Sequence, residues 1–271
     1  MHVFSTKREA LRVIEIGLSL KNISSELRND KDVVLAAIAK KECDMVYASK
    51  KLKNDKEFIL SAVEINGTIL EHVSDELRDD KEVVLRAVKQ NVVAFDYASS
   101  RLKDDREIML AAIVKNGKYI VCASKELRND KEIILAAVKF CGTLLANASD
   151  EMRNDIEVAL TAISQSGEAF YYVSEELKNN EGFMCLAVRE NGMLLRHANE
   201  DMRNDIEIVA GAVVDYPYSL KFASTNLQTN RKLVSLALIH WNPSVFRLNW
   251  HSPILLSYYS INDNAIWMCL A

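Results

Sequence analysis

Closely spaced acidic side chains occur in the run SDELRDDKEVVLRAV, residues 74–88. Carboxylates at this spacing can bind calcium, dock a basic partner or cap the start of a helix. A calcium loop needs oxygen ligands at alternate positions over about twelve residues, with a glycine in the middle. The run has neither feature, so helix capping and docking are the interpretations that remain.

Histidine and cysteine can supply a nucleophile, a general base or metal ligands, and the chain holds five of each. No pair has zinc-ligand spacing, and the sequence contains no metalloprotease motif, nucleophile elbow or glycine-rich phosphate loop. We therefore expect no catalytic residue, no cofactor and no metal. The cysteines form an odd and dispersed set, which predicts free thiols in a reducing compartment: Cys43, Cys122, Cys141, Cys185 and Cys269.

The overall composition is that of a soluble globular protein, because 49% of the 271 residues are hydrophobic and 27% are charged. The net charge of −4 gives no support to a nucleic-acid partner, which needs a concentrated basic face. No apolar run approaches the roughly 20 residues of a membrane span. Charged residues also interrupt the N-terminus, where a signal peptide is apolar. We expect a cytoplasmic protein.

The run at 74–88 recurs every 25 residues in nine copies without insertion. Each copy has a leucine or methionine at its fourth position, which we call the anchor. An alanine follows each anchor by ten residues, from Ala37 to Ala237, and marks a place where backbones approach closely. A repeat of this length indicates a solenoid. His72 and His197 lie five copies apart, roughly 40–50 Å at about 8–10 Å per layer, so they cannot share a metal. The anchors are Leu27, Leu52, Leu77, Leu102, Leu127, Met152, Leu177, Met202 and Leu227.

Each copy predicts a two-helix unit. Apolar residues share one helical face in the first helix, as at Val83, Val84, Ala87 and Val88. A glycine recurs about fifteen residues after most anchors and predicts the left-handed residue that ends this helix. A shorter α or 3₁₀ helix and a serine at a tight return complete the unit. Because one unit cannot bury its apolar face alone, we predict an all-α, right-handed α-solenoid.

In such a unit the charged run precedes the long helix. Asp79 or Asp80 can accept the free N–H groups of the first turn, and Glu82 follows Asp79 by three residues, the capping-box spacing. We interpret the run as helix capping and solvated charge between repeats, with docking of a partner as the alternative.

The ends of the chain depart from the repeat. Residues 1–26 are predicted to form a partial repeat and cap, and residues 27–251 to form nine full repeats. Residues 252–271 are predicted to form a capping helix or to begin a further repeat. All three tryptophans (Trp241, Trp250 and Trp267) lie within the last 31 residues. An aromatic end can cover the exposed core of a solenoid or dock a ligand or partner.

Positions that differ between copies are the places to look for a binding surface. Twenty residues after each anchor, the series is rich in ring-bearing side chains, which are favoured as anchors of protein interfaces. Alternatively, these rings cover the edge of the second helix against the next repeat. The candidate partner-binding residues are Tyr47, His72, Tyr97, Tyr172, His197 and Phe222, with Trp241 and Trp250 at the aromatic end.

The pattern L-[RK]-[ND]-D-[KR]-E-x-x-L-x-A-[VI], followed by a glycine and x-x-L-x-x-A-S, resembles a bacterial repeat known as domain of unknown function 4116. The resemblance covers nearly all of residues 2–251. That family has no assigned activity, and its occurrence in intracellular pathogens, amoeba symbionts and large DNA viruses implies a host-directed effector role. The layout is also similar in architecture to the leucine-rich variant repeat, a right-handed solenoid of alternating α and 3₁₀ helices.

The function that we predict is a non-catalytic α-solenoid scaffold for protein–protein recognition, with an unknown protein partner. The resemblance adds the expectation that it forms part of a bacterial effector, secreted into a host cell. One alternative is a structural spacer within a larger multidomain protein. A second alternative is an enzyme whose motif is not recognised.

Overall fold

The structure, a computed structural model, describes residues 4–40 and 42–240. Within these ranges the elements are helices, and the β-pairing is limited to one isolated bridge between Phe4 and Ile23. The prediction of an all-α repeat solenoid is confirmed, whereas the right-handed twist stays a prediction. The elements repeat in a fixed order of short helix, long helix and 3₁₀ helix.

The elements fall into three sets. The long helices are α1 (Lys7–Glu15), α2 (Lys31–Lys40), α4 (Lys56–Ile65), α6 (Lys81–Gln90), α8 (Arg106–Lys115), α9 (Lys131–Phe140), α11 (Ile156–Gln165), α13 (Glu181–Glu190), α15 (Ile206–Asp215) and α17 (Arg231–His240). The short helices are η2 (Leu27–Asn29), α3 (Lys50–Lys53), α5 (Asp75–Arg78), α7 (Ser100–Lys103), η7 (Leu127–Asn129), α10 (Asp150–Arg153), α12 (Glu175–Lys178), α14 (Glu200–Arg203) and α16 (Thr225–Gln228). The 3₁₀ helices are η1 (Leu20–Asn22), η3 (Glu42–Tyr47), η4 (Gly67–His72), η5 (Val92–Tyr97), η6 (Gly117–Cys122), η8 (Gly142–Asn147), η9 (Gly167–Tyr172), η10 (Gly192–His197) and η11 (Pro217–Phe222).

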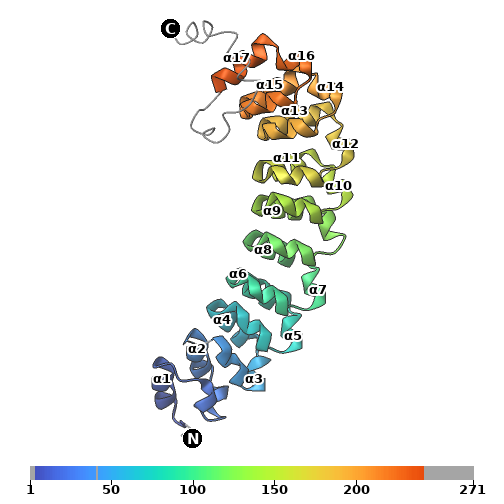
Figure 1. The fold of residues 1–271 in the computed structure, drawn as a ribbon. Coiled ribbons are helices and arrows are strands. Elements are labelled where there is room, and N and C mark those ends of the chain that lie inside the picture. Colours follow the sequence, from blue (N-terminus) through green and yellow to red (C-terminus); the bar gives the residue numbers. More distant parts are fainter. Residues whose placement is uncertain (1–3, 41, 241–271) are drawn as a thin grey trace. The chain divides into compact units, whose positions relative to one another are not determined.

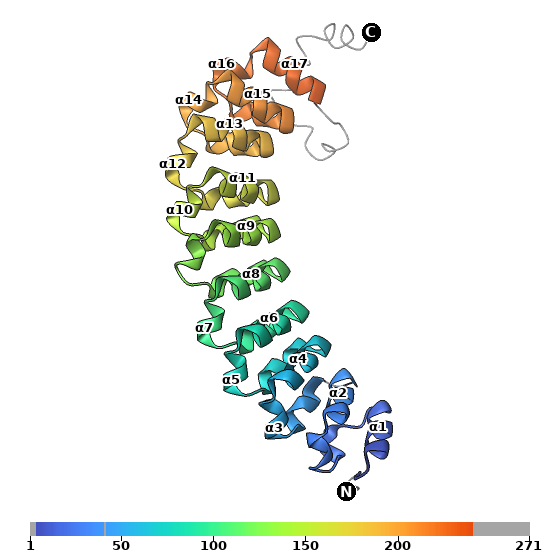
Figure 2. The same ribbon diagram turned by 180° about the vertical axis from the view of Figure 1, so that it is seen from behind.

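The chain forms two compact units, Met1–Glu190 (unit 1) and Asn191–Ala271 (unit 2). In unit 1 the long helices pack in chain order from α1 to α13, and neighbouring 3₁₀ helices such as η3, η4 and η5 pack beside one another as a second layer. The short helices of this unit lie along one edge of the stack (Figures 1 and 2). In unit 2, α15 packs against α17 and both contact η11. The sequence did not indicate this division.

The long helix is fixed by a cap at its start and a buried face. In α6, Asp80 accepts hydrogen bonds from the amides of Glu82 and Val83, both at 3.1 Å. The cap is therefore Asp80, and the proposed capping box between Asp79 and Glu82 is wrong. The apolar face is fully buried, as predicted, with no exposure at Val83, Val84, Ala87 and Val88. Burying such side chains is the main stabilising term, at about 1.5–3 kcal/mol for each large one.

The recurring glycine has a different role from the one predicted. Positive φ occurs only at Gly17 among the glycines of the described ranges, so the others do not end helices in the left-handed conformation. Instead, Gly67 and Gly142 each begin a 3₁₀ helix beside the long helix of the next repeat. A Cβ at Gly142 would lie far inside contact distance of the carbonyl oxygen of Ala162. The glycine is therefore kept small by its close approach to the backbone at the invariant alanine of the next repeat.

A short helix at the anchor was missed by the two-helix prediction. Ser74 begins α5 and accepts the amide of Leu77 at 3.4 Å, which gives this single turn its N-terminal cap. The Ser74 hydroxyl also donates to Asn54 Oδ1 of the preceding repeat at 2.6 Å, and its amide donates to Lys53 O at 3.0 Å. Equivalent serine-to-asparagine bonds of 2.5–2.7 Å recur at Ser49–Asn29, Ser149–Asn129, Ser174–Asn154 and Ser224–Asn204.

These bonds predict a measurable coupling between neighbouring repeats. Ser74→Ala should lower the free energy of unfolding by about 1–2 kcal/mol, because it removes both the cap and the bond to Asn54. Ser124 is the matched control, since it caps Leu127 at 3.3 Å but makes no such bond to the preceding repeat within the described ranges. Urea unfolding followed by circular dichroism should show the smaller loss for Ser124→Ala. Equal losses in the two variants would assign the whole effect to the cap.

Candidate functional site

The basic residue that follows an anchor binds the preceding 3₁₀ helix in six copies. It donates to a backbone carbonyl seven residues earlier, at distances of 2.6–3.2 Å. This contact satisfies a carbonyl that a helix terminus otherwise leaves to solvent. The pairs are Arg28–Lys21, Lys53–Val46, Lys103–Asp96, Arg128–Val121, Arg153–Ala146 and Lys178–Tyr171.

The acidic and basic residues that follow form a ladder of ion pairs along unit 1. Lys81 Nζ lies 2.9 Å from Asp105 Oδ2 and 3.1 Å from Glu107 Oε2, both in the next repeat. In the preceding copy, Lys56 makes the same two contacts with the following repeat. We call this set the charge ladder: Lys7–Asp30, Lys31–Asp55, Lys56–Asp80, Lys81–Asp105, Arg106–Asp130 and Lys131–Asp155.

The ladder aspartates keep their negative charge to low pH. The hydrogen bond from Arg106 lowers the pKa of Asp130, partial burial opposes that effect, and the amide of Ile133 adds to it, so the pKa lies below its usual value. Partial burial acts to raise the pKa of Asp80, but the bonds from Lys56 and from the helix amides outweigh it. The run that first suggested a charged site is therefore used for caps and contacts between repeats.

The ring series lies at one position of the repeat, which holds Cys122 and Asn147 instead of a ring in two successive copies. Each of its members is the last residue of a 3₁₀ helix. Tyr47, His72, Tyr97 and Phe222 are half-buried, whereas Tyr172 and His197 are exposed. We call the members in unit 1 the ring stripe: Tyr47, His72, Tyr97 and Tyr172. His197 and Phe222 belong to unit 2, and Trp241 and Trp250 lie outside the described residues.

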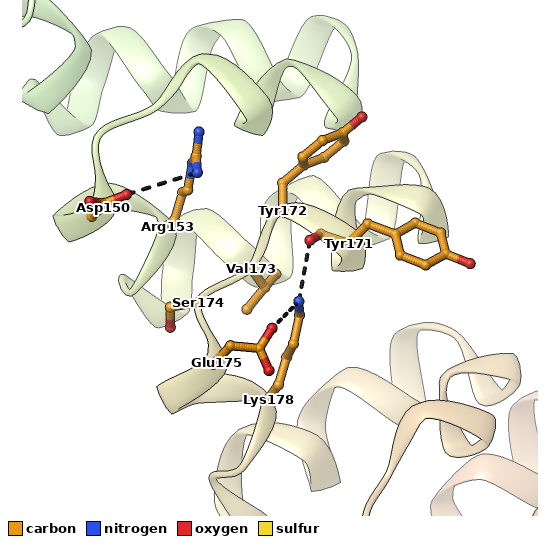
Figure 3. Close-up of a pocket in the computed structure, with 8 residues that line it drawn as sticks. All are labelled: Asp150, Arg153, Tyr171, Tyr172, Val173, Ser174, Glu175 and Lys178. Carbon is orange, nitrogen blue, oxygen red and sulfur yellow. Dashed lines mark hydrogen bonds and ion pairs between the residues drawn. The ribbon is translucent and has the colours of Figure 1, made fainter.

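A cleft of about 390 Å³ opens on unit 1 around Tyr172, and we call it the Tyr172 cleft. It is built from the end of η9 and the two short helices on either side, α10 and α12 (Figure 3). In Figure 3, Arg153 and the Tyr172 ring extend in the same direction, while the Tyr171 ring extends to the side. The lining residues are Asp150, Arg153, Tyr171, Tyr172, Val173, Ser174, Glu175 and Lys178.

The sequence prediction included Tyr172 and missed the other residues of this cleft. One signal was present, because this is the only copy with rings at both nineteen and twenty residues after the anchor, Tyr171 and Tyr172. Glu175 follows Tyr172 by only three residues, whereas Asp150 lies near the start of the same copy as Tyr172 and reaches the cleft only through the fold of that repeat.

The remaining candidate chemistry concerns metal sites, reactive thiols and membrane-spanning helices in the part of the chain that the structure describes. There, no group of three histidine, cysteine or acidic side chains is placed to hold a metal ion. Cys122, Cys141 and Cys185 are free thiols, as predicted. A hydrogen bond from Thr143 lowers the pKa of the exposed Cys141 thiol. None of the described helices is both long and apolar enough to cross a membrane.

Comparison with known proteins gives a single family. A family model described as "Domain of unknown function (DUF4116)" matches residues 10–53, 38–78, 55–103, 105–153, 130–178 and 180–228, which together cover well over half of the chain. These six matches fall in tandem on the 25-residue repeats. No curated protein and no solved structure matches the chain.

Proposed function

Because this chain belongs to the family of the domain of unknown function (DUF4116), we propose that it is a non-catalytic scaffold that recognises another protein through the ring stripe. The observation that carries the proposal is the position of the rings. In unit 1, aromatic side chains recur at the end of the 3₁₀ helices and remain partly exposed, while the apolar faces of the long helices are buried.

The charged motif supports this division of roles. Its aspartates cap helices and its lysines and arginines contact the next repeat, so the residues that most copies share account for the stack. The residues that differ between copies are then free to serve recognition. Tyrosine is enriched at binding surfaces because one ring buries a large area at a small cost in conformational entropy.

A non-catalytic role is part of the same proposal. Hydrolytic and transfer enzymes need a nucleophile or a general base within hydrogen-bond reach of a partner that activates it. In the Tyr172 cleft, the pairs among the lining side chains join a carboxylate to a cation: Asp150 with Arg153, and Glu175 with Lys178. Such pairs suit the rim of a binding site. A bacterial effector acting in the host cytoplasm is the setting that the family resemblance suggests.

The test is to place negative charge on the ring stripe. The triple variant Tyr47→Asp, Tyr97→Asp and Tyr172→Asp should lose the proteins that the wild-type chain retains from a host-type cell lysate, because it charges three of the proposed contacts. Mass spectrometry of retained proteins measures the loss. The control variant Ile65→Asp, Val114→Asp and Ser164→Asp adds the same charge at exposed ends of long helices and should retain them.

Two results would contradict the proposal. One is a wild-type chain that is folded and monodisperse but retains nothing, which is the behaviour of a structural spacer. The other is equal retention by the two triple variants, which would place recognition outside the ring stripe.

A further inference from the structure

We propose that the Tyr172 cleft binds one arginine side chain of the partner protein. This inference rests on the proposed recognition function and names the chemistry of its ligand. The guanidinium would lie against the face of Tyr172, with its charge matched by Asp150 and Glu175. Three independent features of the cleft lead to this assignment.

The first feature is the aromatic surface. Tyr171 and Tyr172 are 57% and 39% exposed, although Phe170, which precedes them in η9, is buried. The face of a tyrosine ring attracts a cation, and arginine is the usual partner because its planar guanidinium stacks on the ring. An exposed ring beside a cleft is therefore a place for a cationic side chain.

The second feature is the charge of the rim. The Asp150 side chain is fully exposed, and that of Glu175 is 82% exposed. The two cations of the lining are much less exposed, Arg153 at 34% and Lys178 at 18% of their side chains. Solvent therefore meets more of the carboxylates than of the cations at this cleft, and a cationic ligand complements them.

The third feature is that both cations of the cleft already donate hydrogen bonds to the fold, although Arg153 Nε is buried without a partner. Arg153 Nη2 donates to Ala146 O at 2.6 Å, and its side chain is 34% exposed. Lys178 Nζ donates to Tyr171 O at 3.2 Å and to Glu175 at 2.8 Å, and its side chain is only 18% exposed. Elsewhere in unit 1, the lysine or arginine at this position also donates a hydrogen bond to a carbonyl of a 3₁₀ helix. These two cations therefore stabilise the repeat fold and do not favour an anionic ligand.

The same contact already exists within one repeat of unit 2. There, Lys221 Nζ lies over the ring of Tyr218 at 3.9 Å from its centroid, and 4.7 Å from that of Phe222. Phe222 and Tyr172 occupy the same position of the repeat, twenty residues after the anchor. In that copy the chain supplies the cation at the nineteenth position after the anchor, whereas the copy with Tyr172 has Tyr171 there.

The experiment uses the full chain labelled with 3-fluorotyrosine and followed by ¹⁹F NMR. The Tyr172 resonance is assigned from Tyr172→Phe, and the probe is the blocked pentapeptide Gly-Ser-Arg-Ser-Gly. We expect the Tyr172 resonance to shift and saturate with this peptide. The same peptide with citrulline should cause no shift, because it keeps the shape of arginine without its charge. The lysine peptide should bind about threefold or more weakly, since an ammonium does not stack.

Matched variants test the rim. Asp150→Asn with Glu175→Gln should weaken binding of the arginine peptide about fivefold or more. Asp75→Asn is the control, because Asp75 is the register equivalent of Asp150 and is also exposed; it should leave binding unchanged. Circular dichroism confirms that each variant is folded. No shift with the arginine peptide, an equal shift with citrulline, or a stronger shift with a glutamate peptide would each overturn the inference.

The outcome can be separated from that of the proposed function. If the arginine peptide causes no shift while the ring-stripe variant still loses its partner proteins, the inference fails and the recognition function stands. If both ring-stripe and control variants retain their partners, the recognition function fails, whatever the peptide does.

Discussion

Replacing Gly142 by alanine is expected to lower the free energy of unfolding by about 3 kcal/mol, a large loss for one added methyl group. The new Cβ would run into the carbonyl oxygen of Ala162, which is backbone and cannot rotate away. That oxygen also accepts the amide of Ser166 at 2.9 Å, so moving it weakens the end of α11. Thermal unfolding followed by circular dichroism should show a melting temperature lower by roughly 6–12 °C.

Gly182→Ala is the matched control for this prediction. Gly182 lies in the first turn of α13, and the nearest atom to an added Cβ is the side-chain oxygen of Asn180 at 3.3 Å. Alanine is a better helix former than glycine, so the change should stay within about 0.5 kcal/mol of the wild type. Similar losses for the two variants would show that close backbone approach is not what requires glycine at position 142.

Acidification is expected to remove about 3 kcal/mol of stability from unit 1 through the charge ladder, after allowance for solvent screening. Its aspartates have pKa values below the ordinary value of about 4, for the reasons given for Asp80 and Asp130. A carboxyl group with a lowered native pKa stabilises the fold above its unfolded pKa. That contribution is lost as the pH falls through the native values. Urea unfolding at a series of pH values between about 6 and 3 measures the loss.

Two variants separate the ladder from general acid sensitivity. Lys81→Met removes the ion pairs of the ladder with Asp105 and Glu107 and should reduce the dependence of stability on pH. Lys89→Met, at an exposed position of the same helix, should leave that dependence unchanged. The ladder stops at Ile156, which stands at the lysine position, and Asn180 stands at the next aspartate position. The double variant Ile156→Lys and Asn180→Asp should add one ion pair to the ladder and increase the dependence of stability on pH. Identical pH profiles in all variants would rule out the ladder as the cause.

Much of the fold was predictable because repetition shows which residue types the stack requires. The anchors, the invariant alanine and the apolar face of the long helix were all recognised. The structure buries the alanine in every copy, every anchor except Leu27, and the apolar faces of the long helices in unit 1. The short helices were missed because a single turn is too brief for apolar periodicity to reveal it. The cap was assigned ambiguously between Asp79 and Asp80, since two acidic residues stand side by side and only the backbone geometry decides between them.

The glycine and the cleft show where sequence reasoning lacked the necessary information. A glycine after a helix usually signals a left-handed end, but at Gly67 and Gly142 the constraint comes from a backbone 20 residues further along the chain. The Tyr172 cleft likewise joins side chains from successive copies. Such contacts depend on how far one repeat is shifted against the next, and the composition of a single copy does not contain that distance.

The contacts between repeats have one further consequence, which concerns the length of the protein. In unit 1 the serine bonds join residues 20 apart, and the ladder joins residues such as Lys56–Asp80, 24 apart. Deleting or duplicating one 25-residue copy among those that share these residues therefore gives every donor an acceptor of the same kind at the same separation. Unequal recombination within the gene can lengthen or shorten the chain without a compensating mutation. Evolution can thus adjust how many surface positions are displayed while the cross-section of the stack stays constant.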